Sequence, residues 1–376
     1  MTNSTGSSHI THHSIVCRRC GAPFPSTGFP FKCPKCSDVF TFARSLPYQP
    51  NLHSPRHLNR IARYFRSFPL EDEGQLVSLG EGGTPLIAVK QDRHQVYLKC
   101  EQHNPTGSFK DRGAAILMSS LRAAGVETAV EDSSGNAGAS LAAYAARCGC
   151  KVKIFVPSYA SGPKRSQIAA YGAEIVEVPG PRTATSNAVL EEASQGMVYA
   201  SHAYLPHGLA GIATMAYEIV EQLEKQPGTV VVPVGQGTLL LGLHLGFEAM
   251  KKAGAIARLP RLLGVQAAAC APISTAYVSG MGAVDEVQEG ETQAEGIRIL
   301  QPIRAAEVIR AVNDSHGEMF TVDEDEIAFG RDALGKLGFY VEPTSAVIWA
   351  GIARALKTCE DPIVAVITGS GYKSGG

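Results

Sequence analysis

A lysine stands at an unusual place in the stretch NPTGSFKDRGAA, residues 104–115. The stretch follows a β-like run that ends at Cys100, and it leads into an apolar-periodic segment that predicts a helix over 109–124. Lys110 therefore falls in the first turn of that helix, where the positive end of the helix dipole disfavours a cation. Such a lysine is either solvated and tolerated, or held for the chemistry of its amine.

Three further loops follow predicted strands and have polar or glycine-rich sequences. Residues 133–137 (SSGNA) and 235–239 (GQGTL) each open a predicted helix, so their backbone N–H groups can receive a carboxylate or a phosphate. Thr368 follows the last predicted strand, and its hydroxyl can reach a heteroaromatic nitrogen. Each loop alone also fits an ordinary helix cap or turn, and GQGTL matches neither the dinucleotide motif nor the P-loop.

The elements that position these loops alternate between strand and helix from Val96 onward. The strands are rich in β-branched residues and almost continuously apolar, as in VVVPV at 230–234, which is typical of parallel strands covered by helices on both faces. The pattern predicts an α/β, doubly wound fold with two sheets, because there are more strands than one domain needs. In such folds ligands bind at the carboxyl ends of the strands.

Together the four loops are more specific than any one of them. A lysine near a phosphate-binding loop, an anion-binding loop and a terminal hydroxyl favours a site for pyridoxal 5′-phosphate (PLP), with Lys110 joined to the cofactor as an imine. Burial in such a pocket would also lower the pKa of the free amine.

Four of the nine cysteines form two C-x-x-C pairs in turn-like sequences. Cys17 and Cys20 form one pair, and Cys33 and Cys36 form the other. Two such pairs can place four thiolates around one tetrahedral Zn²⁺, so we expect a structural zinc whose binding folds this short segment. Four unrelated thiols or a pair of disulfides are the alternatives. The remaining cysteines have apolar neighbours and are expected to be core residues: Cys100, Cys148, Cys150, Cys270 and Cys359.

The charge and composition of the chain argue against several classes of function. With 34 basic and 35 acidic residues the formal net charge is -1, so no basic excess points to nucleic acid or to an anionic membrane. No apolar run reaches the roughly 20 residues that cross a bilayer, and residues 1–13 lack the apolar core of a signal peptide. We expect a cytoplasmic enzyme with a small-molecule substrate, no nucleic-acid or membrane partner, and a homodimeric state.

Six motifs together resemble the PLP-dependent enzymes of the tryptophan synthase β fold (fold type II), and most closely the threonine synthases. They are SLGEGGTPL, NPTGSFKDRGA, SSGNAG, GQGTLLLG, VEPTSA and TGSGYK, in this order along the chain. Many threonine synthases also begin with a pair of C-x-x-C motifs. The resemblance extends from about residue 15 to the end and implies a PLP-dependent lyase of amino-acid metabolism that acts on an amino acid.

The resemblance also assigns roles to individual residues. It implies that Lys110 binds PLP covalently and moves protons at the substrate, that Asn136 faces the phenolic oxygen of the cofactor, and that Thr368 bonds its pyridine nitrogen. The remaining assignments concern two anions. The substrate carboxylate is expected at Ser133, Ser134, Gly135 and Ala137, and the cofactor phosphate at Gly235, Gln236, Gly237, Thr238 and Leu239.

The resemblance further implies how the chain divides. We expect a disordered lead over 1–14, a zinc-ribbon-like module over 15–45, and a PLP-dependent catalytic region over 46–376. Within that region we expect a large domain at 46–125 plus 225–376 and a small domain at 126–224. The cysteine module is expected to be a structural cap on the large domain.

One segment departs from the threonine synthase pattern S-x-N-P-x-R-L-x-G-Q-K-T, whose Ser and Arg bind the phosphate of O-phosphohomoserine. Here residues 203–214 read AYLPHGLAGIAT, with Ala203 in place of the Ser and Gly208 in place of the Arg. A phosphate without a guanidinium loses its strongest charge-assisted contacts. Four nearby cations or histidines are candidates to replace it: Lys164, Arg165, His202 and His207.

We therefore expect PLP-dependent β- or γ-elimination or replacement on an amino acid. The threonine synthase reaction, from O-phosphohomoserine to threonine and phosphate, is the leading case, with poorer selectivity for the phosphorylated substrate than in true threonine synthases. A Gly208→Arg change is expected to raise the use of that substrate. A serine or threonine deaminase is the alternative, and a non-catalytic descendant, in which PLP is structural, is a further one.

Overall fold

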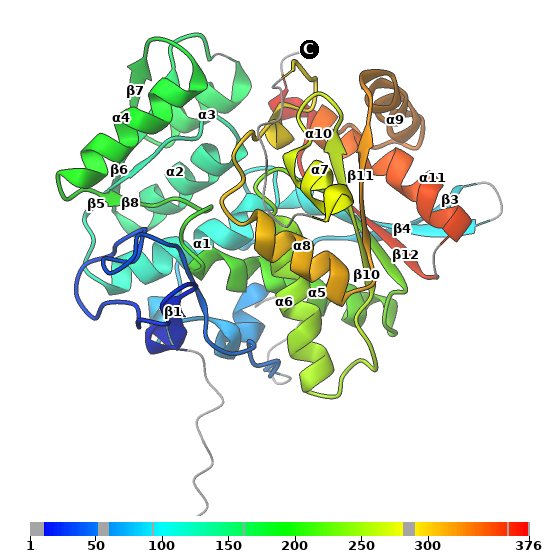
Figure 1. The fold of residues 1–376 in the computed structure, drawn as a ribbon, viewed down its shortest axis with the longest axis horizontal. Helices are drawn as coiled ribbons and strands as arrows, with labels where there is room; N and C mark the ends of the chain where they lie inside the picture. The colour runs from blue at the N-terminus through cyan, green and yellow to red at the C-terminus, as the bar shows by residue number, and fades with distance from the viewer. Residues whose placement is uncertain are drawn as a thin grey trace, which may run out of the picture.

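Two large β-sheets organise the chain, and helices pack against both (Figure 1). The computed structural model describes residues 11–51, 60–91, 94–160, 162–280, 290–358 and 361–374. The smaller sheet lies on the left of Figure 1 and the larger sheet on the right. The alternation of strands and helices predicted from the sequence is confirmed as an α/β fold.

The larger sheet has six strands in the order β11-β10-β9-β12-β4-β3. Neighbouring strands are parallel except for β3 and β4, which form an antiparallel pair at one edge. The central strands β9 and β12 are buried at every residue, as their apolar sequences predict. Strand β3 departs from the expected parallel arrangement and is a largely exposed strand at the edge of the sheet. The strands are β3 (Leu86–Gln91), β4 (His94–Cys100), β9 (Thr229–Pro233), β10 (Arg261–Ala267), β11 (Glu318–Val322) and β12 (Ile363–Ile367).

The smaller sheet has four strands in the order β7-β6-β5-β8, and all its neighbouring pairs are parallel. Because β5 and β8 are parallel neighbours, the loops that follow their carboxyl ends lie at the same edge of the sheet. The strands are β5 (Thr128–Glu131), β6 (Lys151–Pro157), β7 (Glu174–Val178) and β8 (Val198–Tyr199).

The helices pack against these sheets and against one another, and α1 packs on both α2 and α5. The α-helices are α1 (Lys110–Ala123), α2 (Asn136–Cys148), α3 (Pro163–Ala170), α4 (Arg182–Ser194), α5 (His207–Leu223), α6 (Thr238–Lys252), α7 (Pro272–Ser279), α8 (Ala305–Asp314), α9 (Glu324–Lys336), α10 (Pro343–Ala346) and α11 (Ile348–Thr358). The 3₁₀ helices are η1 (His12–Ser14), η2 (Ile61–Ser67), η3 (Glu73–Gln75), η4 (Glu101–His103), η5 (Glu295–Ile297) and η6 (Gly371–Lys373). No helix in the described part of the chain combines the length and apolarity of a membrane span.

The N-terminal module is built on two short antiparallel strands, β1 (Ile15–Cys17) and β2 (Phe40–Phe42). It is drawn in blue in Figure 1 and lies near β8. The Phe31 ring contacts Tyr199, with centroids 5.3 Å apart, and Arg304 donates to Phe40 O at 2.8 Å. The module therefore contacts both the end of β8 and the residue that precedes α8.

Residues 12–14, expected in the disordered lead, instead form η1. The ring of His12 packs edge-on against Phe24 at 4.6 Å and also against His207, so this turn belongs to the module. The 3₁₀ helix η2 buries Ile61 and Tyr64. Cys359, expected in the core, lies outside the described residues.

Candidate active site

Lys110 is the first residue of α1, and the loop before it is joined to the C-terminal loop. The backbone N–H of Phe109 donates to Thr368 O at 3.0 Å, and that of Ser370 donates to Gly107 O at 3.0 Å. Lys373 Nζ donates to Thr106 O at 2.7 Å. Two of the loops singled out from the sequence, far apart along the chain, therefore form one surface.

Asp111, the neighbour of Lys110, fixes the start of the helix. Its buried carboxylate accepts hydrogen bonds from Thr106 N at 2.7 Å, from Thr106 Oγ1 at 2.6 Å, and from Ser140 Oγ at 2.6 Å. Burial raises the pKa of Asp111 to about 6, although these donors oppose the shift. The contacts tie the lysine loop to α2, on which Ser140 lies.

Arg112, the residue after Asp111 in α1, lies in a buried ionic cluster. Its Nε lies 2.7 Å from Glu101 Oε2, and its Nη2 lies 2.7 Å from Glu218 Oε2. Lys99 Nζ also lies 2.7 Å from Glu218 Oε2. Removing one partner of such a cluster leaves an unpaired buried charge, which costs about 3–5 kcal/mol. The backbone under Lys110 is thus held rigidly against β4 and α5.

The electrostatic surroundings of Lys110 favour a reactive amine. Burial lowers the pKa of Lys110 to about 8, although the nearby carboxyls of Glu131 and Glu342 oppose the shift. An amine with this pKa is partly neutral near pH 7, whereas an unperturbed lysine with a pKa of about 10.4 is not. Lys110 can therefore act as a nucleophile and as a proton acceptor.

Asn136 and Thr368 are linked through Glu342, a residue to which the sequence analysis gave no role. Asn136 Nδ2 donates to Glu342 Oε2 at 2.9 Å, and Thr368 Oγ1 donates to Glu342 Oε1 at 3.3 Å. Ser345 Oγ lies 2.8 Å from Thr368 Oγ1 and accepts from Thr368 N at 2.9 Å. The motif VEPTSA, which contains Glu342 and Ser345, is the sequence signal that could have identified them.

The two anion-binding loops predicted from the sequence begin helices, as expected. Residues 133–135 precede α2 and residues 136–137 begin it, while residues 235–237 precede α6 and residues 238–239 begin it. Gly237 caps α6 with φ of +82°, a left-handed conformation that glycine adopts without strain. The first N–H groups of each helix have no acceptor within that helix, so both loops offer backbone donors at a positive helix end. Ser133 Oγ accepts from Gly135 N at 3.3 Å, while Gln236 Oε1 accepts from Ile303 N at 3.3 Å.

A cavity beside Lys110 brings part of the predicted site together. Three predicted site residues line it: Lys110, Ala137 and Thr238. The other residues that line it include Glu131, to which no role was assigned, and His202 and Gly208, which were named above for the missing phosphate contacts. Gly208 and His202 belong to the region where the sequence departs from the threonine synthase pattern, so this region does face the lysine.

Gly208 is one of the residues of α5 that face the backbone of α1. A Cβ atom at this position would lie 3.1 Å from Gly113 O and 3.3 Å from Gly113 Cα. A larger side chain would therefore push against the backbone of α1. The prediction that Gly208→Arg restores use of a phosphorylated substrate is weakened by this contact.

The other candidates for a substitute cation have partners elsewhere. Lys164 Nζ lies 3.4 Å from Glu342 Oε2, and Arg165 pairs with Glu177. His207 is fully buried, and its ring packs on His12, Phe24 and Phe29 of the N-terminal module. Of the four candidates, His202 is the one that lines the cavity.

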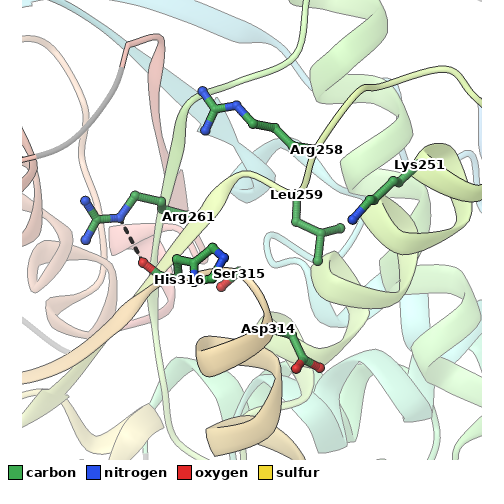
Figure 2. A pocket seen from close by; sticks show the side chains of 7 residues that line it. All are labelled: Lys251, Arg258, Leu259, Arg261, Asp314, Ser315 and His316. Carbon is green, nitrogen blue, oxygen red and sulfur yellow. Dashed lines mark hydrogen bonds between the residues drawn. The ribbon is translucent and has the colours of Figure 1, made fainter.

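A second pocket, of about 490 Å³, lies between the end of α6 and the turn after α8 (Figure 2). Arg261 Nε donates to His316 O there at 2.9 Å. None of the predicted site residues lines this pocket, so its size does not make it the candidate active site. Its lining residues are Lys251, Arg258, Leu259, Arg261, Asp314, Ser315 and His316.

The four cysteines of the module form one cluster. The Sγ atoms of Cys17, Cys20, Cys33 and Cys36 lie within 4.8 Å of one another, and all four cysteines are free thiols. Cys17 and Cys36 are 3.3 Å apart at sulfur, and Cys20 and Cys33 are 3.7 Å apart. Sulfurs bound to one tetrahedral zinc at about 2.3 Å are separated by similar distances. The donor set and its geometry fit a metal ion, and no disulfide joins these four cysteines in this structure.

Comparisons with known proteins identify the family of this chain. The family model described as pyridoxal-phosphate dependent enzyme matches residues 77–369. A threonine synthase from Methanocaldococcus jannaschii is 35% identical over 83% of this chain and 80% of its own length. Another, from Methanosarcina acetivorans, is 31% identical over 95% of this chain and 91% of its own length. This chain belongs to the family of PLP-dependent enzymes and is a homologue of the threonine synthases.

Solved structures support the same fold. Maize serine racemase matches with a TM-score of 0.67 at 22% identity, covering 77% of this chain and 88% of its own. The T.th. threonine deaminase matches with a TM-score of 0.64 at 24% identity, covering 78% of this chain and 94% of its own. The fold is that of the fold type II PLP enzymes, and the expected assignment to a PLP-dependent lyase is confirmed.

The residues around Lys110 fit the cofactor of this family. Ser108 Oγ and Asn136 Oδ1 are buried, yet neither has a hydrogen-bond partner within the described part of the chain. Buried polar atoms are rarely left unpaired. Two such atoms near the lysine are consistent with a polar ligand that would satisfy them.

Proposed function

We propose that this protein catalyses PLP-dependent elimination or replacement at the β- or γ-carbon of a small amino acid. The observation that carries the proposal is the cavity at Lys110, where a lysine of lowered pKa meets the beginnings of α2 and α6. A non-catalytic role for the cofactor is disfavoured, because a buried amine of lowered pKa lines this cavity.

The roles assigned by resemblance form part of this proposal. Bound PLP supplies an electron-withdrawing ring that stabilises negative charge developing at the substrate α-carbon. Lys110 would hold the cofactor covalently and move the proton at that carbon, and Thr368 would bond the ring nitrogen. Asn136 would face the phenolic oxygen, with its amide oriented by Glu342. The N–H groups of 133–137 would receive the substrate carboxylate, and those of 235–239 the cofactor phosphate.

A threonine synthase reaction on O-phosphohomoserine is the first candidate, since the relatives named above are threonine synthases. A serine or threonine deaminase is the second candidate. It is favoured by Ala203 and Gly208, which replace the Ser and Arg of the phosphate-binding pattern, and by the tight contact that a Cβ atom at position 208 would make with Gly113.

A substrate panel tests the proposal and separates the two candidates. The purified protein is loaded with PLP and mixed with O-phosphohomoserine, O-phosphoserine, O-acetylserine, serine and threonine. The visible spectrum of the bound cofactor, phosphate release and ammonia release are followed. Phosphate release from O-phosphohomoserine with formation of threonine identifies a threonine synthase, ammonia release from serine or threonine identifies a deaminase, and no response to any of them contradicts the proposal.

The cysteine cluster is proposed to hold one structural Zn²⁺ per chain, and metal analysis of freshly purified protein tests this. We also propose the division into a large domain (46–125 plus 225–376) and a small domain (126–224), which is consistent with the separate sheets formed by strands of these segments. A homodimer in the cytoplasm remains our expectation, and light scattering of the purified protein tests the oligomeric state.

A further inference from the structure

Two polar side chains meet in the cavity beside Lys110. Glu131 is the last residue of β5, and His202 lies in the loop after β8, the parallel neighbour of β5. Both therefore stand at carboxyl ends of strands, where α/β folds bind their ligands. Both line the cavity together with Lys110.

Neither side chain is satisfied within the described protein. Glu131 is only 1% exposed, and its Oε2 atom has no hydrogen-bond partner there. His202 Nδ1 lies 3.5 Å from Glu131 Oε1 and is also without a hydrogen bond, although the imidazole as a whole stays partly exposed. Leaving a buried polar group unpaired costs about 1–3 kcal/mol, so these two atoms indicate a ligand that pairs with them.

The carboxylate of Asp132, the next residue, differs from that of Glu131 in its hydrogen bonding. Asp132 accepts from Tyr199 OH at 2.6 Å and from Ser186 Oγ at 2.8 Å, and it pairs with Arg182 at 3.2 Å. Asp132 is thus satisfied by the protein, whereas Glu131, one residue before it, is not. Arg182, which pairs with Asp132, does not line the cavity. Lys110 is the only lysine or arginine among the described residues that line the cavity.

The protonation state of Glu131 suits an uncharged or cationic ligand group. Burial raises the pKa of Glu131 well above its usual range, and Asp132 adds to the shift, while Arg182 and Lys110 oppose it. Burial also lowers the pKa of His202 well below its usual range, so the Glu131–His202 pair offers no positive charge to a phosphate dianion. A hydroxyl or an amine would instead donate to the Glu131 carboxyl and contact the His202 ring.

We propose, on the basis of the proposed function, that Glu131 and His202 bind the distal group of the amino-acid substrate and select a hydroxyl or amine over a phosphate at that position. The apolar lining of the cavity, which includes Leu117, Leu141 and Ile212, limits this group to a short side chain. Glu131 and His202 thus determine which substrate is accepted for the reaction that Lys110 is proposed to catalyse.

Matched amino-acid pairs that differ only in the distal group test the inference. The PLP-loaded protein is titrated with serine and O-phosphoserine, with homoserine and O-phosphohomoserine, and with 2,3-diaminopropionate. Dissociation constants come from calorimetry and from the change in the cofactor spectrum. We expect the unphosphorylated member of each pair to bind at least tenfold more tightly, and the diamino acid shows whether an amine or a hydroxyl is preferred.

Variants then assign the selectivity to residues. Glu131→Gln and His202→Asn should each reduce the affinity for the hydroxyl or amine ligand by about tenfold, the loss of roughly one hydrogen bond to a charged or strongly polar group. Their affinity for the phosphorylated ligand should change by less than threefold. Glu177→Gln, the same type of change on β7 of the same sheet but outside the cavity lining, should alter neither.

Three outcomes would overturn the inference. The first is a wild-type protein that prefers the phosphorylated member of each pair. The second is an equal loss of affinity for both members in Glu131→Gln and in His202→Asn, which would indicate a structural role, and circular dichroism melting identifies a folding defect. The third is no response to any amino acid, which contradicts the proposed function as well, whereas the first two leave that function intact.

Discussion

Two groups of polar residues near Lys110 differ in how they are arranged, and we call them the cofactor side and the substrate side after their proposed roles. On the cofactor side, Asn136 and Thr368 both donate to Glu342, and two helix starts provide backbone donors. On the substrate side, Glu131 and His202 lie close together, and Glu131 Oε2 and His202 Nδ1 have no hydrogen-bond partner in the described part of the chain. The first side matches the motifs of the PLP enzymes, and the second departs from the threonine synthase pattern. Cofactor chemistry and substrate choice are therefore separable in this protein.

Lys110 belongs to both sides, and its removal has the largest expected effect. Lys110→Ala should abolish the visible absorbance of covalently bound cofactor and lower turnover by at least about 10³-fold, because both the covalent attachment and the proton transfer depend on the amine. The spectrum and steady-state rates measure this, with the far-UV dichroism as a control for folding. A variant that kept its absorbance would place the covalent link at another residue.

Loss of the metal should affect the substrate side more than the cofactor side. The module contacts the region of His202 through Phe31 on Tyr199 and His12 on His207. Cys33→Ser should remove the proposed zinc and unfold the module, because a structural zinc supplies most of the folding energy of such segments. It should also raise KM for the amino acid several-fold.

Cofactor affinity should change by less than twofold in the same variant. Cys148→Ser, in α2 and outside the cluster, is the matched control and should change neither quantity. Metal analysis, cofactor titration and steady-state kinetics distinguish the outcomes. An equal loss of cofactor and substrate affinity would show that the module supports the whole site.

The lowered pKa of Lys110 predicts how cofactor loading depends on pH. The neutral amine is the nucleophile, and with a pKa of about 8 its fraction falls tenfold for each pH unit below that value. The rate of covalent loading of the cofactor-free protein should therefore rise about tenfold from pH 6 to pH 7, and level off above pH 8. Stopped-flow absorbance measures the rate. A rate that keeps rising to pH 10 would indicate an unperturbed lysine.

Glu342 tests the cofactor side alone. Glu342→Ala removes the acceptor for Asn136 Nδ2 and Thr368 Oγ1, and each such bond contributes about 0.5–1.5 kcal/mol. Cofactor affinity should fall by about tenfold while the preference among amino-acid ligands stays the same. A change in that preference would mean that the two sides are not separable.

Local patterns in the sequence were enough to predict much of this architecture. The helix predicted to open at residues 133–137 is α2 (Asn136–Cys148), and the apolar run VVVPV at 230–234 belongs mostly to β9 (Thr229–Pro233). Both are specified by apolar periodicity and by the turns at their ends. The helices between β10 and β12, α7 to α11, were not predicted individually, although α8 and α11 are strongly amphipathic.

Site residues that belong to a local sequence motif could be predicted, whereas residues that long-range contacts bring together were missed. Lys110 and the helix-start loops follow from local sequence. Glu342 lies next to Asn136 only because α10 packs beside the end of β12, which no local pattern reveals. Glu131 and His202 come together through the pairing of β5 with β8, so their shared cavity required the topology.

The smallest expected effect concerns Gly208, where substrate choice depends on helix packing. In Gly113→Ala the new Cβ would lie 3.4 Å from Gly208 O and 3.6 Å from Ile212 carbons, which are ordinary contacts. That change should be neutral or stabilising by up to about 1 kcal/mol, because alanine favours a helix interior over glycine.

Gly208→Ala should lack this gain, because its Cβ would press on the backbone of Gly113 at 3.1 to 3.4 Å. We expect it to be less stable than Gly113→Ala by about 1 kcal/mol in denaturant melts. Gly208→Arg should be destabilised by about 1–3 kcal/mol, the usual cost of overpacking, without gaining a preference for O-phosphohomoserine. If the arginine variant is stable and turns over that ester faster, the helices separate readily. The substrate side would then be one substitution away from a phosphate site.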